Sequence, residues 1–331
     1  MIQQALHLLH LSGISRVARM MPCRHFIVLN FHRIHDQPSE FHEGMIELSS
    51  MKFREHVEWL GRRVDFVGEA DVATLRPGSR PKVLLTFDDG YSDAYDVIAP
   101  ILEKNGVPAT FFVSPGLIDH SILGAWDRIA YMVKKFRGKG FTFRGREFSM
   151  AQGAQPVYLA LEEWCLSSLP DQGDEFVAEL AQILGMEQPP ASLQQRELVT
   201  WDQVRDLKRR GFAIGGHGST HRVLSSLTFE EQEEEIRFSR VRLIEEGLDP
   251  ISFAFPFGSP RTYSWETREL VTQAGFKLIF SFSGQAPKIS RLDPTRIDRV
   301  AFKSSVAKYD FLLSWTSTYN FIHKFRQEEE E

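Results

Sequence analysis

The hydrophobic and polar positions of this chain fall into short apolar runs separated by longer amphipathic stretches. Runs with the length of buried strands lie at 26–34, 83–87, 109–113, 251–255 and 277–281. Stretches with helical spacing lie at 51–62, 93–105, 201–210, 229–246 and 266–274. Strands that alternate with helices in this way imply parallel strands joined by crossover helices. The pattern therefore predicts an α/β fold.

The segment from about 120 to 196 breaks this alternation. It contains Trp126-Asp-Arg-Ile-Ala-Tyr131, a stretch at 137–146 that is typical of a hairpin, and a helical run at 174–184. We interpret the segment as a subdomain inserted beside the functional site, because long insertions on a rigid scaffold often carry specificity.

The helix predicted at 229–246 begins with a capping-box pattern. Thr228 is followed three residues later by Glu231. The glutamate-rich run at 230–235 is typical of a solvated helix face, and Glu233 with Arg237 supports it as an i,i+4 pair.

Two adjacent carboxylates close the apolar run at 83–87. Asp88 and Asp89 are followed by Gly90, which lets the backbone turn sharply. Side chains alternate faces along a strand, so one carboxylate can ligate a metal while the other acts as a base. The alternative is an ordinary strand end with an Asp-Asp-Gly turn.

A pair of histidines follows a second strand-like run at 212–216. If His217 and His221 form a helical turn, their spacing places both imidazoles on one face. Two imidazoles and one carboxylate make a three-ligand metal site with positions open for water and substrate. A pair of polar loop histidines is the alternative. A zinc finger fails, because no cysteine pair accompanies the histidines.

Three segments carry a resemblance to a known family. Thr86-Phe-Asp-Asp-Gly90, the pair His217-x-x-x-His221 and Phe253-Ala-Phe-Pro-Phe-Gly258 resemble the first three motifs of the polysaccharide deacetylases, also called the NodB-homology family or carbohydrate esterase family 4. Flanking segments at 91–93, 106–113 and 198–201 are similar to the family as well. The resemblance covers roughly residues 25–120 and 195–303. It implies a distorted (β/α) barrel of about seven strands, with the site at the carboxyl ends of the strands.

The resemblance also assigns the residues of a metal-dependent hydrolase. Asp89, His217 and His221 would hold one divalent metal ion, with Zn²⁺ as the first expectation and Co²⁺, Ni²⁺ or Fe²⁺ as alternatives. Asp88 would act as the general base. The backbone N–H of Phe257 would stabilise the oxyanion of the tetrahedral intermediate.

The substrate contacts expected from the sequence are less specific. Pro256 would set the turn that presents the Phe257 N–H, and Trp126, Tyr131 and Trp164 of the insertion would line an aromatic groove. A wide aromatic groove would favour a saccharide, and a closed pocket would favour a small non-sugar amide.

The general acid departs from the common family arrangement. The expected histidine near the end of the barrel is missing, because the one histidine after His221 is His323 in the tail. Some relatives look circularly permuted, with this histidine in an N-terminal element that Asn30-Phe-His-Arg33 resembles. We therefore predict His32 as the acid, with a structural strand-end histidine as the alternative.

Two more positions differ from the family pattern. Phe253 occupies the place of an arginine that pairs with the base, so we predict that Arg299 orients Asp88 instead; a surface pair with Asp298 is the alternative. Gly218 replaces a hydroxyl residue after the first metal histidine, which removes one hydroxyl near the metal but no ligand.

Composition is that of a globular enzyme. The chain has 331 residues, 42% hydrophobic and 25% charged, with a net charge of −5. This charge gives no reason to expect nucleic acid as a partner. The two cysteines, Cys23 and Cys165, are expected to be free thiols, which favours a reducing compartment.

The two ends of the chain are predicted to lie outside the barrel, which would span 25–305. We expect an N-terminal helix at 1–24, docked on the protein or peripherally on a membrane, and a C-terminal helix and acidic tail at 306–331. The apolar stretch at 2–11 lacks the features of a secretory signal. A cytoplasmic location, or one at the inner membrane face, is therefore expected.

These patterns give three hypotheses. The first is a metal-dependent N-deacetylase of an N-acetylated poly- or oligosaccharide, with a lipid-linked saccharide as one option. The second keeps the barrel but hydrolyses a small non-sugar amide. The third is a non-catalytic saccharide-binding relative, which the presence of Asp88, Asp89, His217 and His221 argues against.

Overall fold

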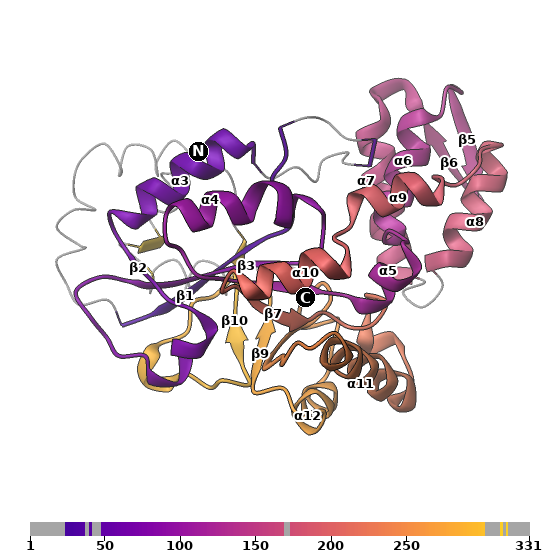
Figure 1. Ribbon diagram of the computed structural model, residues 1–331. Coiled ribbons are helices and arrows are strands. Elements are labelled where there is room, and N and C mark those ends of the chain that lie inside the picture. Colours follow the sequence, from indigo (N-terminus) through magenta and orange to yellow (C-terminus); the bar gives the residue numbers. More distant parts are fainter. Residues whose placement is uncertain are drawn as a thin grey trace.

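A parallel sheet that curls almost into a barrel forms the centre of the protein (Figure 1). The computed structural model describes residues 24–36, 40–41, 48–168, 173–301, 312–313 and 316. Within them the sheet has nine strands in the order β10-β9-β8-β7-β4-β3-β1-β11, with β2 paired to β3. The strands are β1 (Phe26–Phe31), β2 (Asp65–Phe66), β3 (Lys82–Phe87), β4 (Ala109–Val113), β7 (Ala213–Gly216), β8 (Ser252–Ala254), β9 (Leu278–Ser281), β10 (Ile297–Asp298) and β11 (Val300–Ala301).

The two ends of this sheet meet at Arg299. β10 and β11 lie at opposite ends of the strand order, yet only Arg299 separates them in sequence. Leu29 pairs with Val300 and Asn30 with Ala301, so β11 lies beside β1. The chain itself thus joins the two ends of the sheet. The predicted distorted (β/α) barrel is confirmed. It has nine described strands instead of about seven, and this number includes β2, β10 and β11, which have only two residues each.

The apolar strands are buried on both faces. All six residues of β1 are buried. Phe26 and Val28 pack in a cluster with Leu84, Phe112 and Phe280 from other strands, which is the interior of the barrel. The alternate residues of β1 pack in the cluster that includes the outer helices. Burial on both faces explains why these strands are continuous apolar runs in the sequence.

Helices cover the barrel and connect its strands. The α-helices are α3 (Ser50–Gly61), α4 (Ala99–Lys104), α5 (Pro115–His120), α6 (Ala125–Lys135), α7 (Ala154–Ser168), α8 (Gly173–Leu184), α9 (Ala191–Glu197), α10 (Trp201–Arg209), α11 (Phe229–Glu245) and α12 (Trp265–Gln273). Short 3₁₀ segments are η1 (Glu69–Thr74), η3 (Met150–Gln152), η4 (Leu224–Ser226) and η5 (Ile289–Arg291), and η2 (Ala94–Ile98) is a π-helix. α11 and α12 lie side by side on the outside of the barrel (Figure 1).

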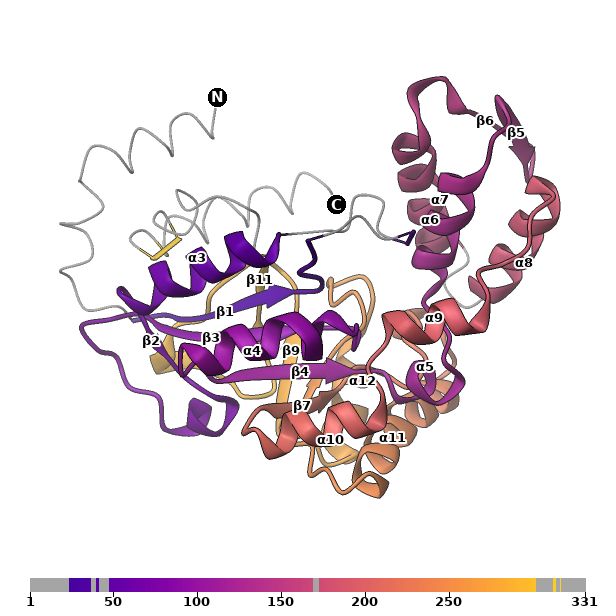
Figure 2. The same ribbon diagram turned by 45° about the horizontal axis from the view of Figure 1, so that its top comes forward.

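The segment between β4 and β7 carries a helical subdomain that projects from the barrel (Figure 2). It contains α6, α7, α8 and a hairpin of β5 (Gly140–Phe143) and β6 (Arg146–Ser149). Its helices enclose a hydrophobic cluster of their own, with Phe143, Tyr158 and Phe176 fully buried. The break in the sequence pattern therefore coincides with a separate layer of structure.

Several local features differ from the sequence expectations. The first strand ends at Phe31 and does not continue to residue 34. The helix expected at 93–105 begins with the π-helical turn η2, before α4. The capping box of α11 forms as predicted, since Thr228 accepts a hydrogen bond from the Glu231 N–H and its own N–H donates to the Glu231 carboxylate at 2.8 Å.

The predicted ends of the chain lie almost entirely outside the described residues. This applies to the N-terminal helix at 1–24 and to the C-terminal helix and tail at 306–331. Cys23 and His323 also lie outside them, whereas Cys165 is a buried free thiol. Among the described helices, none combines the length and apolar character needed to cross a membrane.

A buried histidine on α3 is expected to make the fold sensitive to acid. Burial, together with Lys52, lowers the pKa of His56 to about 4. The His56 imidazole takes up a proton near pH 6.5 in the unfolded chain but only near pH 4 in the folded protein. Its contribution to the free energy of unfolding is therefore fully present above pH 6.5 and is lost as the pH falls towards 4. This loss in unfolding free energy is at most about 3 kcal/mol.

We therefore expect His56→Gln to flatten the decline in unfolding free energy between pH 7 and pH 4.5. Urea denaturation at both pH values measures it, with the exposed His120→Gln as the matched control. An equally steep decline in the two variants would show that His56 does not cause it.

Candidate functional site

Three side chains that follow two strands of the sheet converge at one edge of the barrel. Asp89 follows β3, and His217 and His221 follow β7. The Nε2 atoms of His221 and His217 lie 3.1 and 3.4 Å from the same atom, Oδ1 of Asp89. One ligand atom from each of the three residues lies within 4.8 Å of the other two. The carboxyl ends of parallel strands meet at one edge, so the sequence motifs come together in space.

The donor set of this cluster fits a divalent metal ion. Nδ1 of His217 lies 2.8 Å from the carbonyl oxygen of Ala254, which directs Nε2 towards the cluster. Oδ1 of Asp89 is buried and has no well-oriented hydrogen bond from any residue that the structure describes. A buried oxygen that faces two imidazole nitrogens is the arrangement that a cation with mixed nitrogen and oxygen ligands requires. This set does not distinguish Zn²⁺ from Co²⁺, Ni²⁺ or Fe²⁺.

The protonation states of the cluster suit ligation. Burial alone would raise the pKa of Asp89, but the imidazoles of His217 and His221 beside it hold that pKa well below its usual range. Burial lowers the pKa of His221 despite the nearby Asp89 carboxylate. An ionised carboxylate and a neutral imidazole are the forms that bind metals.

The two histidines are held by a loop, so the helical turn that their spacing would allow does not form. Gly218 and His221 have positive φ values of 68° and 61°, which no helix contains. A side chain at Gly218 would place its Cβ 3.2 Å from Pro256 Cγ, so glycine suits this position for both reasons. The loop still brings the two imidazole centroids to 4.7 Å.

Glu235 of α11 organises this loop, a role that the sequence did not suggest. The glutamate-rich run was expected to be a solvated face, but Glu235 is only 5% exposed. Its Oε2 accepts hydrogen bonds from the backbone N–H groups of Ser219 and Thr220, both at 2.9 Å, and its Oε1 accepts one from the Thr220 hydroxyl at 2.6 Å. The expectation failed because a period-based argument does not show which glutamate of a run faces a neighbouring loop.

Glu235→Ala is expected to weaken metal binding by about 10- to 100-fold, since supporting residues of metal ligands typically have effects of this size. Competition with a chelating dye measures the affinity for Zn²⁺. The matched control is Glu234→Ala, one residue earlier and exposed. Equal affinities in the two variants would contradict a role for Glu235 in positioning the loop.

Asp88 lies next to the cluster and is held by Arg299. Arg299 Nη1 donates to Asp88 Oδ1 at 2.7 Å and to Asn30 Oδ1 at 2.8 Å, while Asn30 Nδ2 donates to Asp88 Oδ2 at 3.2 Å. Burial raises the pKa of Asp88, but Arg299 and the nearby imidazoles outweigh it and keep that pKa below its usual value. The structure therefore holds an ionised carboxylate beside the candidate metal ligands.

Arg299 reaches Asp88 because it lies where the two ends of the sheet meet. It is 1% exposed and lies between β10 and β11, and its contact with Asp88 is the predicted one. The surface pair with Asp298 is wrong, since Asp298 accepts a hydrogen bond from the Ser281 hydroxyl instead. Phe253, at the position of the family arginine, is fully buried and packs on Phe276.

His32 lies at the mouth of the same site. Its Nε2 is 4.0 Å from Asp88 Oδ2, and its side chain is 35% exposed. Together with Asp88, Asp89 and His217 it lines a cavity of about 300 Å³. The structure thus brings the predicted acid into the site, and its role in proton transfer stays a prediction.

Pro256 and Phe257 form a tight turn at the end of β8. Gly258 N–H donates to the Pro256 carbonyl at 2.6 Å, and Phe257 has a φ of 60°. The Phe257 ring lies 4.8 Å from that of His221 and 5.9 Å from that of Trp126. The Phe257 ring therefore contacts His221 of the candidate metal cluster, and the role of the Phe257 N–H stays a prediction.

Trp126 of α6 forms one wall of the site. Its ring lies 4.5 Å from that of His221, and its Nε1–H donates to the Tyr91 hydroxyl at 2.8 Å. Tyr91 in turn donates to Asp127 at 2.8 Å and lies under the guanidinium of Arg33 at 3.9 Å. Burial raises the pKa of Asp127 to about 7 although Arg33 and Tyr91 oppose the shift. This buried network, which the sequence did not reveal, fixes the position of the indole.

The predicted aromatic groove is otherwise wrong. Tyr131 is 8% exposed and stacks on Phe41, and Trp164 packs edge-on to Phe143 inside the insertion. Neither is among the described residues that line the cavity at Asp88. Tyr131 is buried in the hydrophobic cluster of the insertion, and the half-buried Trp164 packs against that cluster.

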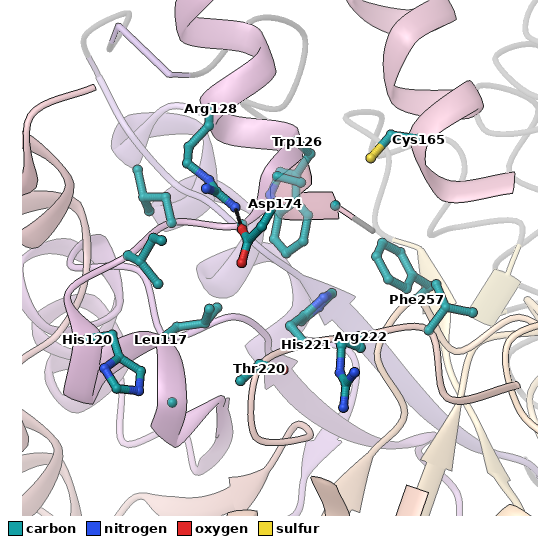
Figure 3. Close-up of a pocket in the computed structure, with 17 residues that line it drawn as sticks. Leu117, His120, Trp126, Arg128, Cys165, Asp174, Thr220, His221, Arg222 and Phe257 are labelled. Carbon is teal, nitrogen blue, oxygen red and sulfur yellow. Dashed lines mark hydrogen bonds and ion pairs between the residues drawn. The ribbon is translucent and has the colours of Figure 1, made fainter. Parts of the chain in front are cut away.

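A second cavity, shown in Figure 3, shares Trp126, His221 and Phe257 with the cavity at Asp88. Its volume is about 350 Å³. Figure 3 shows Arg128 joined to Asp174 above it, an ion pair between α6 and the start of α8. This cavity therefore lies between the barrel and the insertion.

Comparison with solved structures shows that other proteins share this fold. The Streptococcus pyogenes deacetylase PplD in complex with acetate has a TM-score of 0.58 and 16% identity, covering 89% of this chain and 99% of that one. IcaB from Ammonifex degensii has a TM-score of 0.55 and 18% identity, covering 89% of this chain and 97% of that one. At these identities the likeness shows the fold alone.

Sequence comparison identifies the family. The putative polysaccharide deacetylase YxkH of Bacillus subtilis (strain 168) is 35% identical over 81 residues. This match spans 23% of the chain and 29% of YxkH, so the chain matches less than a third of that relative. The model of the family described as "Polysaccharide deacetylase" matches residues 76–145 and 169–279, more than half of the chain. The chain therefore belongs to the polysaccharide deacetylase family.

Proposed function

We propose that this protein is a metal-dependent hydrolase that removes the N-acetyl group from an N-acetylated sugar of a poly- or oligosaccharide. The observation that carries the proposal is the ionised Asp88, held by Arg299, directly beside the cluster of Asp89, His217 and His221. Membership of the polysaccharide deacetylase family supports it.

Each residue of the site has a task in this reaction. Asp89, His217 and His221 would hold the metal, whose chemistry when bound is Lewis-acid activation of water and of a carbonyl group. Asp88 would take a proton from the attacking water. Its Oδ1 is committed to Arg299, which leaves Oδ2, the atom nearer to His32 and His217, for this proton.

Two further groups would complete amide hydrolysis. The backbone N–H of Phe257 would donate to the oxygen that gains negative charge as water attacks the acetyl carbon. His32 would donate a proton to the nitrogen as the C–N bond breaks, so that acetate and a sugar amine leave. Its place at the mouth of the cavity, 4.0 Å from Asp88, suits this transfer.

A small non-sugar amide is the second candidate substrate. One observation favours it: of the three aromatic residues expected to form a groove, only Trp126 lines the 300 Å³ cavity. A cavity of this volume lies at the lower end of the range for ligand sites.

A cytoplasmic location, and peripheral contact with a membrane, stay predictions from the sequence.

The test is acetate release by the full chain loaded with Zn²⁺. We expect acetate from oligomers of N-acetylhexosamines, loss of activity after chelation, and its return when metal is added back. Simple N-acetyl amides without a sugar serve as the comparison. Hydrolysis of these amides alone would select the second candidate. Binding of saccharide with no acetate from any substrate would overturn both candidates.

A further inference from the structure

The inserted subdomain contributes a carboxylate to the catalytic cavity. Glu162 lies on α7 and lines the same 300 Å³ cavity as Asp88 and Asp89. All other described lining residues except Trp126 come from the barrel. The insertion therefore supplies two groups to this cavity, an aromatic ring and a carboxylate.

A buried tyrosine fixes the orientation of this carboxylate. Tyr158 lies one helical turn before Glu162 on the same face of α7, and it is 1% exposed. Its hydroxyl donates to Glu162 Oε1 at 2.5 Å. A carboxylate accepts hydrogen bonds at both oxygens, so Glu162 can accept a further hydrogen bond in addition to that from Tyr158.

The guanidinium group of the site is engaged away from Glu162. Arg299 binds Asp88 and Asn30, and His32 also lies beside Asp88. Among the residues that the structure describes, no lysine or arginine pairs with Glu162. The wall at Glu162 thus accepts hydrogen bonds and offers nothing to an anion.

We propose that Glu162 is a specificity-determining residue that accepts a hydrogen bond from a hydroxyl or amino group of the saccharide and disfavours acidic sugars. The inference rests on the proposed deacetylase function and narrows its substrate class to neutral or amino-bearing N-acetylated saccharides. Trp126 and Glu162 would contact the sugar from the same side, with the ring packing on its apolar face. Glu162 would then select substrates in two ways, by a hydrogen bond to a neutral or amino-bearing sugar and by repulsion of a negatively charged sugar.

Kinetics of Glu162→Gln and Glu162→Ala test this proposal. The probes are a neutral N-acetylhexosamine oligomer and an oligomer of the same length in which the neighbouring sugar carries a carboxylate. For Glu162→Ala we expect KM on the neutral oligomer to rise by about 10-fold, the size of one lost hydrogen bond to a charged group, with little change in kcat. For Glu162→Gln we expect the preference for the neutral oligomer to fall by about 10-fold or more.

Glu163→Gln is the matched control, because Glu163 is the next residue of α7 and is exposed. Tyr158→Phe provides a second variant that leaves the carboxylate in place but removes the hydroxyl that orients it. For Tyr158→Phe we expect KM on the neutral oligomer to rise and the preference for that oligomer to fall. Both changes should be smaller than in the Glu162 variants.

The outcomes separate this inference from the proposed function. If the wild-type protein releases no acetate from any saccharide, the proposed function fails and the inference fails with it. If the wild-type protein is active but KM and the charge preference are the same in Glu162→Gln and Glu163→Gln, the role of Glu162 is overturned and the function stands. A fall in kcat with unchanged KM and preference would also overturn a role in substrate selection.

Discussion

Replacement of Asp88 by asparagine is expected to lower kcat for acetate release by about 100- to 10,000-fold, the usual contribution of a general base. Asparagine has nearly the same shape, but it cannot take a proton from water. The residues of the metal cluster are untouched, so the variant should bind as much metal as the wild-type protein. Acetate release at saturating saccharide, together with metal content, measures both expectations.

A loss of stability has to be separated from this catalytic effect. Arg299 is 1% exposed and donates to Asp88, so the variant leaves a buried guanidinium without its anion. Removing one partner of a buried ion pair typically costs about 3–5 kcal/mol. Activity should therefore be measured at a temperature where circular dichroism shows a folded variant, with the exposed Asp96→Asn as control. A folded, metal-loaded Asp88→Asn protein with the kcat of the wild type would exclude Asp88 as the base.

Replacement of His221 by alanine is expected to remove the bound metal and, with it, nearly all hydrolysis. The wild-type protein should retain about one Zn²⁺ per chain after loading and dialysis, as expected for a site with three protein ligands. In the variant only Asp89 and His217 remain, and two ligands hold a divalent ion poorly. Elemental analysis of the dialysed proteins measures the metal directly, without reference to activity.

The exposed His120→Ala is the matched control for a general effect of removing a histidine. We expect it to keep both metal and activity. If His221→Ala retains the metal content of the wild type, His221 is not a ligand. If the wild-type protein itself retains no metal, the metal-dependent mechanism is wrong for this protein.

The local features of the fold and site were predictable from sequence because each depends on neighbouring residues. The strand at 109–113 and the capping box at Thr228 follow from short-range pattern and hydrogen bonding. The grouping of Asp89, His217 and His221 was also accessible, since motifs at the carboxyl ends of parallel strands meet at one edge. Spacing alone did not settle the backbone of the histidine pair, because positive φ values at Gly218 and His221 form a loop where the spacing also allowed a helical turn.

The partner of Asp88 shows where sequence reasoning becomes incomplete. Arg299 was one of several arginines that could have served, and nothing local marks it out. It contacts Asp88 because the two ends of the sheet meet at this residue, 211 positions away along the chain. Closure of the barrel is a property of the whole sheet, so only the tertiary structure decides which arginine is buried beside the base.

By itself, the sequence determined the α/β class, the succession of the main barrel strands and the identity of the residues that can carry metal and proton chemistry. Their periodicity, caps and motif spacing are local quantities. Only the tertiary structure decided that Glu235 holds the histidine loop, that Glu162 lines the cavity and that Tyr131 and Trp164 pack within the insertion. The physical reason is that burial and hydrogen bonding of a side chain depend on which distant segment packs against it.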